Sequence, residues 1–144
     1  MKTLWVVVAD QSRARLFGVS NPLGTLQELE GLAAPELRLR DGELESDRRG
    51  HTVGAAGRGH SLEKRESLRE RAAVRFAETI AERLTTGAND HAYTALILVA
   101  PPRFLGLLRD ALPERLMRLV VHSLDKDLVT LPSADIRSHL PERL

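Results

Sequence analysis

Two stretches near the start of the chain are separated by only three residues, and this spacing limits the folds that the chain can adopt. Residues 4–9 form an uninterrupted, largely β-branched apolar run, which is typical of a strand buried on both faces of a sheet. Residues 13–19, after the polar turn at 10–12, alternate charged or small side chains with apolar ones. A connection this short cannot cross over to a parallel strand, so we expect an antiparallel hairpin.

A third strand and a long helix are predicted next. The turn at 21–24 leads into residues 25–32, which predict a more polar strand that completes an antiparallel meander. A helix is then indicated by apolar residues that recur every four positions, with Ser61 as its N-cap and its end near Gly87. The recurring residues are Leu68, Ala72, Phe76, Ile80 and Leu84.

The second half of the chain alternates strands and helices. Residues 94–100 predict a buried strand stopped by two prolines, residues 104–112 a short helix, and residues 119–124 the last strand. Pro132 and Ser133 open a C-terminal helix, for which we expect Ile136 and Leu140 to face inward.

This order of elements predicts an α/β fold with a ribonuclease H-like mixed five-stranded sheet (βββαβαβα) and helices on its faces. Right-handed crossovers place the fourth and fifth strands beside the first, and the hairpin strands lie on the other side. A doubly wound Rossmann-type sheet is the alternative, and the short first connection argues against it.

The whole chain, 1–144, is of a length typical of one domain. Within it, no hydrophobic periodicity survives between about residues 33 and 60, where Arg, Glu, Asp and Gly predominate. Structureless stretches of this length are uncommon in compact domains unless they are functional or disordered. We therefore expect a flexible loop there.

Composition excludes several classes of protein. The chain has no cysteine, so disulfides, thiolate metal sites and cysteine nucleophiles are ruled out. No apolar run approaches the roughly 20 residues of a membrane span, and the first apolar run is too short for a signal peptide. We therefore expect a cytoplasmic protein, and no residue pattern calls for a cofactor.

One candidate site follows from the predicted sheet, because ligands favour the edge where parallel strands end. Asp10, Arg103, Lys126 and Asp127 would meet there, as weak candidates for catalytic residues. A two-metal nuclease needs several carboxylates, and Asp10 with Glu66 or Glu70 would supply part of such a set. The fourth strand ends without a carboxylate, so no metal site is predicted. The sequence favours a turn-forming role for Asp10, whose side chain would accept bonds from nearby amides.

A second candidate site lies where the loop meets the long helix. Arg58, His60, Lys64 and Arg65 lie close together there, beside glycines that let a phosphate approach the backbone. These residues are candidates for binding RNA or another anion. Acidic residues upstream offset the charge, and no aromatic side chain is interleaved for base stacking, so a solvated loop is the alternative.

Several of these segments together resemble the bacterial host-attachment protein family over essentially the whole chain. The segment at 100–106 is the most specific of them. The matching stretches are Trp5-Val6-Val7-Val8-Ala9-Asp10, Ser12-Arg13-Ala14-Arg15-Leu16-Phe17, Phe76-Ala77, Leu98-Val99-Ala100-Pro101-Pro102-Arg103-Phe104-Leu105-Gly106-Leu107-Leu108-Arg109 and Lys126-Asp127-Leu128.

This resemblance implies a fold similar to the middle domain of archaeal and eukaryotic peptide-chain release factors. Those proteins carry a Gly-Gly-Gln motif before their long helix, where this chain has Gly57-Arg58-Gly59-His60 and lacks the glutamine. The resemblance thus implies a ribosome or tRNA partner without peptidyl-tRNA hydrolysis, and an indirect role in attachment.

Three functions remain open at this stage. The first is a non-catalytic RNA- or ribosome-binding domain that uses the basic residues. The second is a phosphoester or ester hydrolase, with or without a metal, at the edge around Asp10. The third is an interaction protein that recruits a partner through an apolar helix face or the edge of the hairpin.

Overall fold

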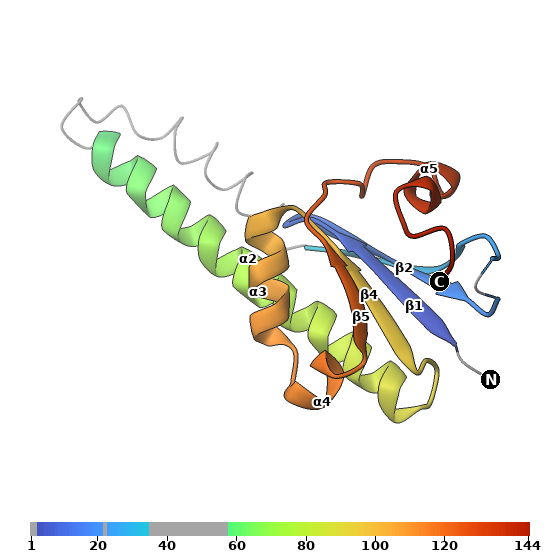
Figure 1. Ribbon diagram of the computed structural model, residues 1–144. Coiled ribbons are helices and arrows are strands. Elements are labelled where there is room, and N and C mark those ends of the chain that lie inside the picture. The colour runs from blue at the N-terminus through green and yellow to red at the C-terminus, as the bar shows by residue number, and fades with distance from the viewer. Residues whose placement is uncertain (1–2, 22, 35–57) are drawn as a thin grey trace.

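The computed structural model describes residues 3–21, 23–34 and 58–144, with side chains in the last range described from residue 62 onward. These residues form a five-stranded mixed sheet in the order β3-β2-β1-β4-β5. Figure 1 shows the sheet with helices on both faces, so the predicted α/β layout is confirmed.

The strands pair as the sequence predicts. β1 (Leu4–Ala9) is antiparallel to β2 (Arg13–Val19), and β2 is antiparallel to β3 (Gln27–Ala33). On the other side, β4 (Ala95–Val99) runs parallel to β1, and β5 (Val120–Leu124) runs parallel to β4. β1 therefore lies in the centre of the sheet, where all six of its residues are buried.

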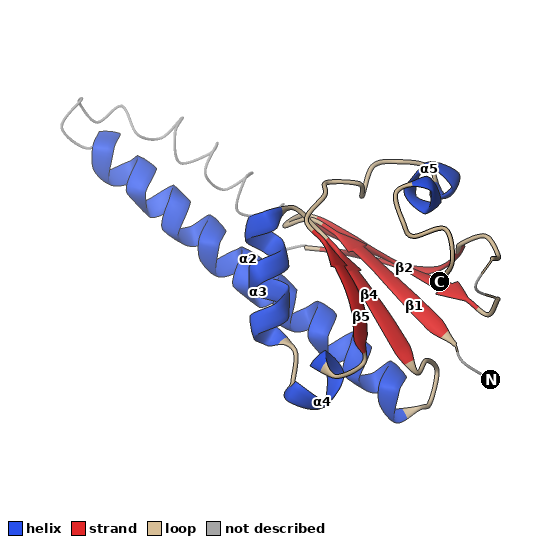
Figure 2. Ribbon diagram, viewed as in Figure 1, coloured by secondary structure: helices blue, strands red, loops and turns tan. Residues whose placement is uncertain are grey.

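The helices divide between the two faces of the sheet (Figure 2). α2 (Arg58–Asn89), α3 (Pro102–Ala111) and the short α4 (Glu114–Met117) lie on one face, and α5 (Ser133–Ser138) lies on the other. The sequence predicts all of these except α4.

One prediction about the long helix needs correction. Ser61 does not cap it, because α2 begins three residues earlier, at Arg58. The predicted end near Gly87 is confirmed to within two residues, because α2 ends at Asn89. A Cβ atom at Gly87 would lie 2.8 Å from two ring atoms of Trp5, so this glycine lets the helix approach the sheet closely.

The predicted flexible loop at 33–60 falls mainly on residues outside the described part of the chain. At its two ends, Ala33 closes β3 and Arg58 to His60 belong to α2.

The larger half of the core lies between the sheet and α2 with α3. Alternate residues of the central strands, such as Val7 and Leu98, face this side and pack with Ile80 and Leu84 of α2. Phe104 of α3 joins the same cluster, and its ring lies 6.0 Å from that of Phe76.

The opposite face of the sheet is covered by the end of the chain, residues 128–144, which we call the C-terminal cover. Four of its side chains are buried against the sheet: Leu128, Val129, Ile136 and Leu140. The prediction that Ile136 and Leu140 face inward is confirmed, although Leu140 packs from beyond the end of α5.

Two arginines of β2 hold the C-terminal cover in place. Arg15 donates to the carbonyl oxygens of Val129 and Leu131 at 2.9 and 2.6 Å, and Arg13 donates to that of Val129 at 3.0 Å. Arg15 also pairs with Glu28 of β3 at 2.8 Å. β2, β3 and the C-terminal cover thus meet at one guanidinium group, although the cover lies more than 100 residues further along the chain.

Candidate functional site

A pocket of about 280 Å³ opens where the parallel strands end. Asp10 reaches it from the end of β1, Arg103 from the start of α3 and Asp127 from the segment after β5. The structure therefore brings together three of the four residues expected at this edge. Lys126 does not line the pocket, and its Nζ lies 3.5 Å from Nδ1 of His139 instead.

Asp10 has a structural task at the entrance to the pocket. Its Oδ1 accepts hydrogen bonds from the backbone N–H groups of Ser12 and Arg13 at 2.8 and 2.9 Å. These bonds hold the tight turn between β1 and β2, so the turn-forming interpretation of Asp10 is confirmed. One carboxylate oxygen is thereby committed to the turn.

Arg103 is paired across the mouth of the pocket. Its Nη2 donates to Oε2 of Glu70, on α2, at 2.7 Å, and the Arg103 side chain is 81 % exposed. An ion pair this exposed contributes little to stability, but it offsets the charge of Arg103. From the sequence Glu70 is a candidate metal ligand only, because no sequence pattern links it to Arg103, 33 positions away.

The remaining walls of the pocket are apolar. Ala73 of α2 and Phe104 and Leu107 of α3 line it beside the charged groups. With Asp10 and Asp127 acidic and Arg103 paired, the pocket combines an acidic side with an apolar wall. Within the described ranges, no three His, Asp or Glu residues are grouped closely enough to hold a metal ion.

The second candidate site lies on α2 rather than in a loop. Arg58 and His60 belong to the first turn of the helix, so the expectation that they precede it is wrong. Lys64 is exposed and Arg65 is half-buried. The start of α2 projects beyond the sheet (Figure 1), and among the described side chains of this helix the first buried one is Ala72.

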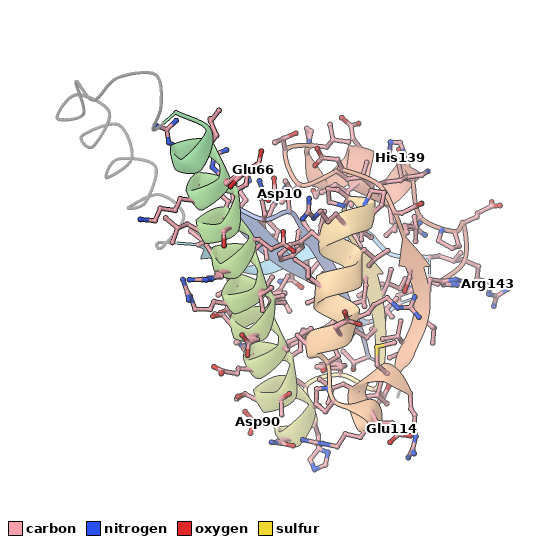
Figure 3. All side chains as sticks on the ribbon, turned by 90° about the vertical axis from the view of Figure 1, so that its left-hand side faces the viewer. Asp10, Glu66, Asp90, Glu114, His139 and Arg143 are labelled. Atoms are coloured by element: carbon pink, nitrogen blue, oxygen red, sulfur yellow. The ribbon has the colours of Figure 1, made fainter. Side chains whose placement is uncertain are left out.

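Figure 3 relates the two candidate sites. Glu66, on the projecting part of α2, and Asp10, at the pocket, lie at the same end of the molecule, whereas Asp90 and Glu114 lie at the other. The end of the sheet that carries the pocket therefore also carries the basic part of the helix.

No helix in the described part of the chain combines the length and apolar character needed to cross a membrane.

The mixed sheet and the long helix define a class of α/β fold that a solved structure of another protein shares. The chain is similar over 97 % of its length to 35 % of the crystal structure of the archaeal translation termination factor aRF1, with a TM-score of 0.52 and 12 % sequence identity. At this identity the likeness shows the fold alone, and the chain spans about a third of that factor.

The family is shown by the sequence. Residues 5–140 match the family described as proteins required for attachment to host cells, and the chain belongs to this family. No curated protein matches the chain.

Proposed function

We propose that this protein is a non-catalytic domain that binds RNA, on the ribosome or on tRNA, through the start of α2, and that it acts on attachment indirectly from the cytoplasm. The observation that carries the proposal is the projection of a basic helix segment away from the core of the domain.

The charges of α2 are unevenly distributed. Residues 58–75 contain six basic and three acidic residues, a surplus of three positive charges, whereas residues 76–89 contain one basic and two acidic residues. The first turn of the helix has no acidic residue. Free amides and the helix dipole favour an anion at a helix N-terminus, and the surplus of basic residues adds to that preference.

The length of the projection suits a nucleic acid backbone. At 1.5 Å per residue, the segment from Arg58 to Arg71 extends about 20 Å. A partner that contacts this segment would meet several phosphates, and binding of that kind weakens with salt because counterions are released. The likeness to a translation termination factor supports an RNA partner connected with translation.

The test is binding of the purified protein to ribosomes and to tRNA across a salt series. We expect Arg58, Lys64 and Arg65 changed together to alanine to lower the affinity and to reduce the log–log salt slope by about 2, which corresponds to three lost contacts with a single strand. A matched control changes three exposed arginines outside α2, Arg109 in α3 and Arg115 and Arg118 in and beside α4. Absence of wild-type binding at low salt, or an equal loss in the control, would contradict the proposal.

A second candidate function rests on the pocket. Asp10, Glu70, Arg103 and Asp127 converge there from four elements, which is the arrangement that a phosphoester or ester hydrolase at this edge would need.

For this candidate we expect Asp10→Asn to reduce turnover of a nitrophenyl phosphate or acetate by about 100-fold, with or without Mg²⁺ or Mn²⁺. Asparagine retains an Oδ1 that accepts the same two amide bonds, so the turn is kept. Glu114→Gln, at the opposite end of the molecule, is the control. Turnover that survives Asp10→Asn unchanged would rule out this role for Asp10.

A further inference from the structure

Three carboxylates line the strand-end pocket, and one of them has both oxygens available to a ligand. Oδ1 of Asp10 accepts the two amide bonds of the β1–β2 turn, and Oε2 of Glu70 accepts the bond from Arg103. Asp127 is exposed, and no donor in the described part of the chain bonds either of its oxygens. The Asp127 carboxylate can therefore accept two parallel hydrogen bonds from one ligand.

The chain that follows Asp127 fixes its position at the pocket. Leu128 and Val129 are buried against the sheet, and the carbonyl oxygen of Val129 accepts bonds from Arg13 and Arg15. A group that is held in place before binding loses less conformational freedom when a ligand arrives. Asp127 is therefore better prepared to bind than a carboxylate on an untethered segment.

The other groups in the pocket suit a flat ring. Phe104 and Leu107 of α3 line its wall, and the bond to Glu70 holds the Arg103 guanidinium at its mouth. The Arg103 side chain is 81 % exposed, so its planar group is open to a ligand, and unpaired RNA bases stack on such planes. The volume of about 280 Å³ is below the roughly 300–1,000 Å³ of pockets for larger ligands, which suits a single base.

From these observations we propose that the pocket binds a guanine base of the RNA strand that the start of α2 holds, an inference that rests on the RNA-binding function proposed above. Guanine presents N1–H and the N2 amino group side by side, and both can donate to the two oxygens of Asp127. Adenine and cytosine instead place an acceptor nitrogen beside the amino group, and uracil places its N–H between two carbonyl groups. These acceptors repel a carboxylate, so guanine is the base that the pocket favours.

The pocket lies close to the segment that would hold the strand. Glu70, which lines the pocket, follows Arg65 by five residues on α2, or about 8 Å along the helix axis. Glu66 and Asp10 lie at the same end of the molecule (Figure 3). The carboxylates repel phosphates from the pocket, so the RNA backbone stays on the basic segment and the base alone enters.

The test compares short single-stranded RNAs that bind the full chain at low salt, followed by fluorescence anisotropy. One RNA contains only uridine, a second has one central guanosine, and a third has inosine there, which lacks the N2 amino group. We expect the guanosine RNA to bind about tenfold more tightly than the uridine RNA, with the inosine RNA between them. This ratio should keep its size as the salt concentration rises, because bonds to a base release no counterions.

The decisive variant is Asp127→Asn, which places an amide donor against the donors of guanine. The ratio of the two affinities should then fall close to one. The control, Asp125→Asn, removes the same charge from an exposed residue outside the pocket and should keep the ratio of about ten. Arg103→Lys keeps the charge but loses the planar group, so it should also lower the ratio.

The outcomes separate this inference from the function on which it rests. If the wild type binds none of these RNAs at low salt, both are overturned. If it binds all three equally, or if the guanosine preference survives in Asp127→Asn, the guanine pocket is refuted while RNA binding by α2 stands.

Discussion

A chain cut after Asp127, without the C-terminal cover, should lose cooperative unfolding altogether. The cover contributes four buried side chains, of which Val129 and Ile136 are fully inaccessible to solvent. Removing a buried Leu, Ile or Val typically costs about 1–5 kcal/mol. Four such losses together approach the 5–15 kcal/mol by which a whole domain is usually stable.

The measurement is thermal unfolding followed by circular dichroism and by calorimetry. The shortened chain should show no heat-absorption peak and should bind a hydrophobic dye, because one face of the sheet is uncovered. A full-length variant, Ile136→Ala, should lower stability by about 2–5 kcal/mol. Its control, Thr130→Ala, changes an exposed residue of the same segment and should stay within about 0.5 kcal/mol of wild type. A cooperative transition of unchanged enthalpy in the shortened chain would contradict this account.

The need for this cover is partly visible in the sequence. Residues 4–9 are apolar at every position, so both faces of β1 must be buried and one layer of helices cannot suffice. Ile136 and Leu140 indicate which segment supplies the second layer. The order of the strands follows in the same way, since the short β1–β2 turn and the handedness of the crossovers allow little else.

Features that depend on partners distant in sequence could not be predicted in this way. α4 is a helix of four residues, too short to show an amphipathic pattern. In the sequence Gly87 resembles a residue that ends a helix. The contact that requires a glycine there, with the Trp5 ring, involves a residue 82 positions away, so the local sequence does not reveal it. An N-cap at Ser61 would start α2 at Leu62, four residues late, because a cap residue is only a local preference and does not fix where a helix begins.

The candidate pocket likewise contains residues whose positions the sequence predicts and one whose position it does not. The rule that parallel strands end at one edge predicts that its strand-end residues converge, and Asp10, Arg103 and Asp127 do meet there. The same rule also predicts Lys126 at this edge, but its side chain lies near His139 instead. Neighbouring residues in an extended segment point in opposite directions, which sequence order alone does not resolve.

Arg15→Ala should be the most damaging single substitution of a charged residue on β2. The Arg15 side chain is 17 % exposed, its guanidinium lies 5.1 Å from the Phe17 ring centroid, and it donates to two carbonyl groups of the C-terminal cover. Hydrogen bonds from a charged donor contribute about 1.5–3 kcal/mol each. The carbonyl of Leu131 loses the donor that Arg15 supplies, whereas that of Val129 keeps Arg13, so we expect a net loss of about 3 kcal/mol.

Arg13→Ala is the matched control, because Arg13 is exposed and donates once, to a carbonyl that Arg15 also reaches. Its loss should cost about 1 kcal/mol or less. Urea denaturation of the three proteins at pH 7 measures both differences. Equal destabilisation by the two substitutions would show that Arg15 has no special part in holding the cover.

Unfolding at low pH provides an independent test of the contact between Arg15 and Glu28. The hydrogen bond from Arg15 is the main cause that lowers the pKa of Glu28 below its usual 4.5, with a smaller opposing effect of burial. A carboxyl group whose pKa is lowered by folding stabilises the protein above its unfolded pKa, and this contribution is lost as the pH falls through the folded value. The stability advantage of the wild type over Glu28→Gln should therefore be present at pH 7 and shrink below about pH 4.5. In an Arg15→Ala background the advantage should be nearly absent at both pH values, because the group that binds the carboxylate is gone. If the advantage keeps its size and pH dependence without Arg15, another group must hold Glu28, and the three-way junction of β2, β3 and the C-terminal cover would not depend on this arginine.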